Sequence, residues 1–265
     1  MPAPDLAPPP EFARVARPLS VHMLPRSVEP AALAGAVVLV IDNLRASVTI
    51  AAALHAGARA VRPTLTVEDA LLAKSQADPS HPPPLLGGER GGTRIEGFDL
   101  DNSPMRYTPE RCSGRDVIFT TTNGTAALLH ASLAARVLVA SLANLSAVVA
   151  AVADDPRPVH VLCAGTRDEV SLDDCLPAGA FVDRLLAAGR ALTQDDSARL
   201  CLRAWREASA TPESLHAAMR DSRGGRNLLR LSLDADVAFC ATPDTLPVVP
   251  VFDSATGLIT PLLPV

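Results

Sequence analysis

The amino-acid sequence predicts an α/β protein, in which a layered, mostly parallel or mixed β-sheet has flanking helices and an antiparallel C-terminal part. Short apolar runs, typical of strands buried on both faces, alternate with segments of helical spacing. This alternation favours parallel strands joined by helices. From Asp236 onward, short apolar runs alternate with turn residues instead, which is typical of antiparallel strands.

The first half of the chain contains two strand–helix units. The run "AVVLVI" (residues 36–41) is apolar throughout, as expected of a buried strand, and "LRASVTIAAALHAG" follows it with helical spacing. "ARAVRPT" is expected to be the second strand. "TVEDALLAK" then begins a helix with Thr66 as its N-cap.

The second half continues the alternation. "RDVIFTTTNGTAALLHASLA" and "RVLVASLANLSAVVAAVADD" each predict a strand followed by a helix, and "PVHVLCAG" predicts one more buried strand. Three further helices are expected. They lie in "SLDDCLPAGAFVDRLLAAG" at least from Pro177 onward, over "TQDDSARLCLRAWREA" and over "TPESLHAAMRDS".

Length and composition are those of a globular protein. The 265 residues can bury a substantial core, and 48% of them are hydrophobic while 20% are charged. We expect a flexible, proline-rich N-terminus over residues 1–20 and a single α/β domain over residues 21–265.

Charge and hydropathy disfavour several classes of partner. The net charge of −5 and the 3% of aromatic residues disfavour binding to nucleic acid, which needs a cationic surface. The richest apolar run, "AALAGAVVLVI", is shorter than the ~20 residues that span a bilayer, and the N-terminus lacks the apolar region of a signal peptide. The five cysteines have no C-x-x-C spacing, which favours free thiols. We therefore expect a cytoplasmic protein without a membrane partner.

The segment "LLGGERGGTRIEGFDLDNSP" (Leu85–Pro104) is rich in glycine and charge. Five glycines, three acids and two arginines lie between Gly87 and Asp99. We expect neither a packed helix nor a long regular strand here. Its glycine pairs would let the main chain approach a ligand closely.

Polar residues follow three of the predicted strands directly. Asp42 follows the first strand and Arg45 lies one turn later, while "TTTNG" (Thr120–Gly124) and "CAGTRDEVSLDD" (Cys163–Asp174) follow two others. Ligands of α/β proteins bind beyond the carboxyl ends of the strands. We therefore expect these side chains to converge on one edge of the sheet.

Several of these features have a second interpretation. The turn in "TTTNGT" would present main-chain N–H groups to an anion, or it is an ordinary capped turn. Asp42 would hold Mg²⁺, accept a phosphoryl group, or only cap the next helix. Ser171 and Asp174 fit a capping box, which would make Asp174 structural.

Five segments together resemble the 2-phosphosulfolactate phosphatase family and extend from about Val37 to Phe252. They are "VLVIDNLRAS", "GGERGGTRIEGFDLDNSP", "FTTTNGTAAL", "CAGTRDEVSLDDCLPAGAFV" and "DVAFCATPDTLPVVPVF". The resemblance implies a magnesium-dependent phosphatase that hydrolyses 2-phospho-3-sulfolactate to 3-sulfolactate and phosphate. The chain departs from the usual family pattern at Asn43–Ser47, where Val-Leu-Arg-Ala-Thr is usual, and at Pro177, where cysteine is usual.

The resemblance also implies the residues of the site. A catalytic role is expected of Asp42, Arg45, Glu89 and Arg90. Substrate binding is expected of Arg94, Asn102, Thr121, Thr122, Asn123, Gly124 and Arg167. The carboxylates expected to bind Mg²⁺ are Asp42, with Glu89 or Asp174.

The implied substrate is a small phosphorylated polyanion with roughly three to four negative charges. Arginine side chains and Mg²⁺ would bind it, and Asp42 would either hold the metal or attack the phosphorus. Two alternatives stay open: a magnesium-dependent phosphatase of another small organic phosphate, and a non-catalytic relative that binds the anion. A homo-oligomer is compatible with the sequence.

Overall fold

The computed structural model describes residues 17–193 and 195–262. The strands are β1 (Pro18–His22), β2 (Val37–Ile41), β3 (Ala60–Thr64), β4 (Leu85–Arg90), β5 (Thr93–Arg94), β6 (Asp116–Thr120), β7 (Arg136–Ala140), β8 (Val159–Cys163), β9 (Ala191–Leu192), β10 (Pro250–Asp253) and β11 (Leu258–Pro261). The α-helices are α1 (Ala46–His55), α2 (Val67–Ser75), α3 (Pro109–Cys112), α4 (Gly124–His130), α5 (Leu145–Val152), α6 (Leu172–Ala187), α7 (Asp196–Ala208), α8 (Pro212–Asp221), α9 (Arg223–Arg230) and α10 (Asp234–Cys240). Short 3₁₀ helices are η1 (Pro25–Ser27), η2 (Pro30–Leu33), η3 (Pro104–Arg106) and η4 (Leu142–Asn144).

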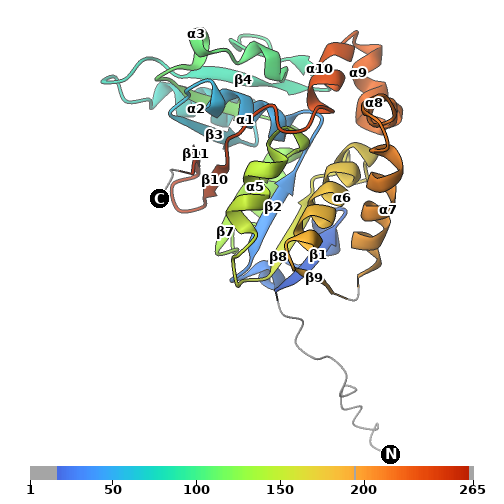
Figure 1. Cartoon of the computed structure of the whole chain (residues 1–265). Coiled ribbons are helices and arrows are strands. Elements are labelled where there is room, and N and C mark those ends of the chain that lie inside the picture. Colours follow the sequence, from blue (N-terminus) through green and yellow to red (C-terminus); the bar gives the residue numbers. More distant parts are fainter. Residues whose placement is uncertain (1–16, 194, 263–265) are drawn as a thin grey trace, which may run out of the picture.

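Within the described residues, eleven strands form one mixed sheet with helices packed around it (Figure 1). The strand order is β5-β4-β6-β3-β11-β10-β7-β2-β8-β1-β9. The predicted α/β class, with flanking helices and an antiparallel C-terminal part, is confirmed. No helix in the described part of the chain is long and apolar enough to cross a membrane.

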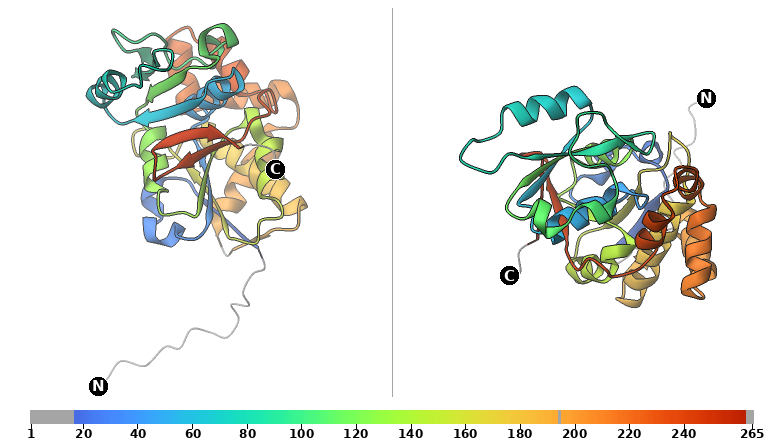
Figure 2. Two further views of the ribbon diagram at one scale, coloured as in Figure 1. Left: turned by 90° about the vertical axis from the view of Figure 1, so that its left-hand side faces the viewer. Right: turned by 90° about the horizontal axis from the view of Figure 1, so that it is seen from above.

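The sheet consists of two groups of parallel strands joined by a hairpin. β2 pairs in parallel with β7 and β8, and β8 with β1, while β3, β4 and β6 form the second parallel group. The antiparallel hairpin β10–β11 connects β7 to β3. Figures 1 and 2 show the second group turned across the direction of β2. The carboxyl ends of β2 and β8 therefore meet those of β4 and β6 at one cavity.

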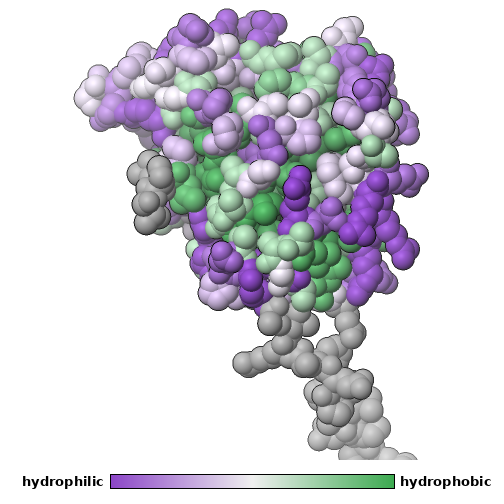
Figure 3. Space-filling model, viewed as in Figure 1, coloured by the Kyte–Doolittle hydropathy of each residue, from purple (hydrophilic) through white to green (hydrophobic). Residues whose placement is uncertain are grey.

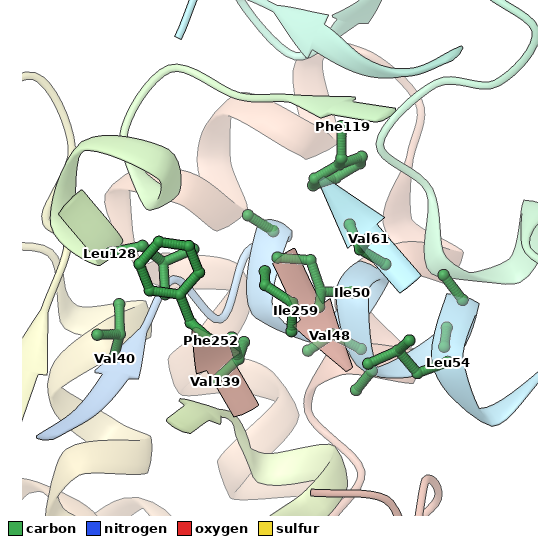
Figure 4. Close-up of a cluster of buried hydrophobic side chains, with 14 of the residues drawn as sticks. Val40, Val48, Ile50, Leu54, Val61, Phe119, Leu128, Val139, Phe252 and Ile259 are labelled. Atoms are coloured by element: carbon green, nitrogen blue, oxygen red, sulfur yellow. The ribbon is translucent and has the colours of Figure 1, made fainter. Parts of the chain in front are cut away.

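Apolar layers cover both faces of β2. Its side chains alternate between the layers, with Val38 and Val40 in one and Leu39 and Ile41 in the other. Figure 4 shows the first layer, where Phe252 of β10 lies among side chains from α1, α4 and the neighbouring strands. The C-terminal hairpin is thus part of the core.

Several expected boundaries are wrong. The C-terminal part begins with α10, because Val237 and Cys240 bury the same helical face before the hairpin starts. The helix expected at least from Pro177 onward is confirmed as α6, which begins earlier, at Leu172, and contains this proline near its N-terminal end. Residues 18–20, expected to be flexible, belong to β1, and residues 1–16 lie outside the described part.

The first six residues of the glycine segment form the mostly buried strand β4, and no long regular strand extends beyond it, as expected. β4 pairs in parallel with β6. A Cβ atom at Gly87 would overlap the Tyr107 hydroxyl, and one at Gly88 would overlap the main-chain oxygen of Thr120. These two glycines therefore allow close packing within the protein and do not line the ligand cavity.

Another glycine sets the contact between α6 and α7. The apolar face of α7 packs on α6, and Figure 3 shows hydrophilic side chains on the right-hand side of the molecule, where α7 runs. A Cβ atom at Gly179 would overlap the main-chain oxygen of Cys201 and lie 2.6 Å from the Cβ of Trp205. Only glycine allows the two helices to approach this closely.

We expect Gly179→Ala to lower the free energy of unfolding by about 1–3 kcal/mol, because the added methyl group overpacks this contact. A loss of this size lowers Tm by about 2–4 °C per kcal/mol in a thermal unfolding experiment. Ala187→Ser, an exposed change on the same helix, is the control and should change Tm by less than about 2 °C. An unchanged or higher Tm for Gly179→Ala would show that α6 and α7 are farther apart.

Candidate active site

A cavity of about 410 Å³ lies where the carboxyl ends of the two strand groups meet. It is lined by Asp42, Leu44, Arg45, Glu89, Gly91, Gly92, Asn102, Thr122, Asn123, Thr166, Arg167, Arg223, Gly224, Asn227, Leu228 and Arg230. Seven of the predicted site residues are among them: Asp42, Arg45, Glu89, Asn102, Thr122, Asn123 and Arg167. The structure therefore brings together residues that lie 125 positions apart in the sequence, from Asp42 to Arg167.

Asp42 connects strand β2 to the cavity. It follows β2 directly and is only 8% exposed. Its Oδ1 accepts a hydrogen bond from the main-chain N–H of Ala46 at 3.3 Å, so it also caps the start of α1. The same side chain thus caps α1 and lines the cavity.

The environment of Asp42 favours its protonated form. Burial is the main reason that its pKa is raised to about 7, and the nearby carboxylates of Asp173 and Glu89 contribute to this shift. At neutral pH, a cation beside Asp42 would therefore displace a proton that the isolated carboxyl group would already have lost.

Glu89 holds two loops of the cavity together. Its Oε1 accepts hydrogen bonds from the main-chain N–H and the hydroxyl of Thr122, at 3.0 and 2.9 Å. Its Oε2 accepts one from the main-chain N–H of Gly92 at 2.7 Å. In the turn after β6, the main-chain N–H of Thr122 therefore binds a carboxylate of the protein itself. The sequence had suggested that this turn presents its N–H groups to an anionic ligand.

Arg45 lies in a buried ion pair. Its guanidinium donates to Asp236 of α10, and to the main-chain oxygen of Gly92 at 2.9 Å. The other oxygen of Asp236 accepts a hydrogen bond from the Ser103 hydroxyl at 2.7 Å. Both ionic side chains are 2% exposed, so the pair fixes the guanidinium at the edge of the cavity.

Asn102 brings an unused amide group to the cavity. The residue is 4% exposed, and the hydroxyl of Thr49 donates to its main-chain oxygen at 2.9 Å. Its buried side-chain Oδ1 has no hydrogen-bond partner among the described residues. Because an unpartnered buried polar atom is costly, this amide is best explained by contact with a ligand or bound water.

Asp174, an expected metal ligand, has its carboxylate directed elsewhere. Its oxygens accept the main-chain N–H groups of Asn43 and Gly165, at 2.9 and 2.8 Å, and it does not line the cavity. The proposed capping box is absent, because the side-chain oxygen of Ser171 accepts no hydrogen bond from a main-chain N–H group of α6, and its hydroxyl donates to Asp173. Asp174 joins the loops that follow β2 and β8.

Four other expected residues also lie outside the cavity lining. The guanidinium of Arg90 donates to the main-chain oxygens of Glu89 and Leu65, and Arg94 is exposed on β5. The hydroxyl of Thr121 contacts that of Thr125. Gly124 lies against Asp42, where a Cβ atom would be 3.0 Å from Oδ2 of the carboxylate.

Helix α9 contributes a wall that the sequence did not predict. Five of its eight residues line the cavity: Arg223, Gly224, Asn227, Leu228 and Arg230. This helix follows another helix, α8, so none of its residues directly follows a predicted strand. The signal available in the sequence was the arginine-rich run "RGGRNLLR" with a glycine pair near its start.

Comparisons with known proteins agree with the resemblance noted from the sequence. Residues 22–255 match the family model described as 2-phosphosulpholactate phosphatase. The chain is 41% identical over 221 residues to a probable 2-phosphosulfolactate phosphatase of Symbiobacterium thermophilum, covering 83% of this chain and 92% of the relative. Similar relatives with the same description come from Deinococcus radiodurans, 40% identical over 234 residues (88% and 92%), and from Synechococcus sp. strain RCC307, 40% identical over 240 residues (88% and 95%).

Because the pKa of Asp42 is raised, we expect that replacing this residue stabilises the protein to an extent that depends on pH. The folded state binds this proton more tightly than the unfolded state, so Asp42 costs progressively more stability between about pH 4 and pH 7. In metal-free buffer, Asp42→Asn should raise Tm by at least about 3 °C at pH 8, with little gain at pH 4.

Asp221→Asn is the matched control, because the Asp221 side chain is 83% exposed. Its effect on Tm should be below about 1 °C at either pH. Equal effects of Asp42→Asn at pH 4 and pH 8 would contradict the raised pKa.

Proposed function

Because the chain belongs to the 2-phosphosulpholactate phosphatase family, we propose that it hydrolyses 2-phospho-3-sulfolactate to 3-sulfolactate and phosphate with the help of Mg²⁺. The observation that carries the proposal is the cavity at Asp42, where a buried carboxylate and several arginines face the same space. Its volume of about 410 Å³ suits a small substrate.

The charge of the cavity lining supports a polyanionic substrate. The lining includes four arginines, namely Arg45, Arg167, Arg223 and Arg230, and two carboxylates, namely Asp42 and Glu89. The lining therefore has a formal charge of +2 (four minus two), although the whole protein has a charge of −5. Phosphate, sulfonate and carboxylate groups together would add roughly three to four negative charges, which these arginines partly neutralise.

The oxygen ligands of the cavity fit a magnesium ion bound partly by substrate. Mg²⁺ commonly uses one or two carboxylates together with water and substrate phosphate oxygens. Asp42 is the residue that would hold it, with Glu89 nearby. Among the described residues, no cluster of three or more His, Cys, Asp or Glu side chains is arranged to enclose a metal. Bound Mg²⁺ would neutralise charge on the phosphate oxygens.

The chain's own residues supply the remaining functions. Arg45, fixed by Asp236, would bind a phosphate oxygen and stabilise charge in the transition state. The side-chain amide of Asn102 would contact the ligand or the attacking water. The free thiols of all five cysteines fit the reducing cytoplasm, where we propose that the enzyme acts.

Release of phosphate from 2-phospho-3-sulfolactate, measured with and without Mg²⁺, tests the proposal. We expect turnover that EDTA abolishes and that added Mg²⁺ restores. Asp42→Asn should lower kcat at least ~100-fold, the size of the loss when one electrostatic stabiliser is removed.

Asp221→Asn again serves as the control and should keep wild-type turnover, since this exposed residue does not line the cavity. Full turnover in EDTA would refute the metal requirement. Full magnesium-dependent turnover by a folded Asp42→Asn variant would refute the role of Asp42.

A further inference from the structure

We propose that helix α9 binds a second acidic group of the substrate through Arg223 and Arg230, and so selects phosphate esters that carry such a group. The inference rests on the proposed phosphatase function and assigns the part of the cavity that the sequence did not predict. Both side chains line the cavity. Neither has a cavity-lining carboxylate as its ion-pair partner among the described residues.

The N-terminal end of α9 is anchored beside the buried carboxylate of Asp173. The main-chain N–H of Gly224 donates to Asp173 at 3.2 Å, and a Cβ atom at Gly224 would lie only 2.6 Å from its Oδ2. Asp173 is 2% exposed. Glycine at this position therefore lets α9 come close to the first turn of α6, which positions Arg223 at the cavity.

The other end of α9 is anchored on the turn between β4 and β5. A Cβ atom at Gly92 would lie 2.7 Å from Leu231 and 3.2 Å from the side-chain nitrogen of Asn227. Leu228, 4% exposed, packs in the core below. Because both ends of the helix are held, α9 forms a positioned wall of the cavity.

The charges on this wall are available to an anion. Arg223 pairs with Glu169, which is 65% exposed, and Arg230 donates to the amide oxygen of Asn227 at 3.2 Å. An exposed ion pair is weak, so a bound anion can compete for Arg223. Arginine also offers a planar donor pair that matches carboxylate and sulfonate oxygens.

The lining carboxylates and the arginines of α9 come from different elements of the cavity. The lining carboxylates follow β2 or lie on β4, at Asp42 and Glu89, whereas α9 contributes only arginines and neutral residues. A phosphate bound with a cation suits the carboxylates. A sulfonate or carboxylate, which needs no metal, suits α9.

Arg226 provides a matched control on the same helix. It pairs with Asp221, its side chain is 60% exposed, and it does not line the cavity. Arg226→Gln therefore removes the same charge from α9 without removing a cavity donor. Any loss caused only by the net charge or stability of the helix would appear in this variant too.

The test is calorimetric titration of wild type, Arg223→Gln, Arg230→Gln and Arg226→Gln with 3-sulfolactate and, separately, with inorganic phosphate. 3-Sulfolactate carries sulfonate and carboxylate groups but no phosphate. We expect each cavity variant to lose affinity for 3-sulfolactate about tenfold more than affinity for phosphate, and Arg226→Gln to bind both as wild type does. Unchanged binding of 3-sulfolactate in both cavity variants, or an equal loss for both ligands, would overturn the assignment.

Failure of the proposed function gives a different result. A wild-type protein that releases phosphate from other phosphorylated acids, but not from 2-phospho-3-sulfolactate, would refute the proposed substrate. The same variants would then be titrated with the dephosphorylated acid of the preferred ester. Wild-type affinity for that acid in Arg223→Gln and Arg230→Gln would overturn the role of α9.

Discussion

Buried carboxylates fix the loops around the cavity. Asp174 binds the main-chain N–H groups of two loops, and Glu89 binds those of two others. Separating any pair of loops would leave a buried carboxylate without its donors, which is costly. Asp42 shares this buried environment and, like Glu89, lines the cavity; its pKa is raised first by burial and then by the carboxylates of its neighbours. The buried carboxylates that fix the loops therefore also give the cavity negative charge, which favours binding of a cation. The cation and the arginines can then bind an anionic substrate.

The alternation of strands and helices predicted the class of fold, and the residues that directly follow strands predicted part of the cavity, whereas Glu89 and Asn102 were expected only from the family resemblance. Polar residues directly after apolar strands stand out, and Asp42, Asn123 and Arg167 follow strands whose carboxyl ends converge. The strand ends do not converge within one parallel sheet, because an antiparallel hairpin lies between two groups of parallel strands. This arrangement depends on pairing between strands far apart in the sequence, which local patterns do not encode.

The sequence did not predict which of two adjacent side chains faces the cavity. Arg90 is next to Glu89, yet only Glu89 faces the cavity, because adjacent residues of a strand point to opposite faces. Asp173 and Asp174 are likewise adjacent, and each binds a different part of the backbone. The wall formed by α9 depends on tertiary contacts of small residues, which composition alone could not locate. The arginines of α9 add to the positive charge of Arg45 and Arg167, which follow strands.

The central claim is that the cavity at Asp42 is where the phosphoryl group is bound. A crystal structure of the protein with Mn²⁺ and orthovanadate, an ion that resembles phosphate, tests this claim most directly. We predict an anomalous signal from Mn²⁺ beside Asp42, with vanadate next to it and within reach of Arg45. Clear density for both ions at a place outside this cavity, with the cavity itself holding only water, would contradict the account.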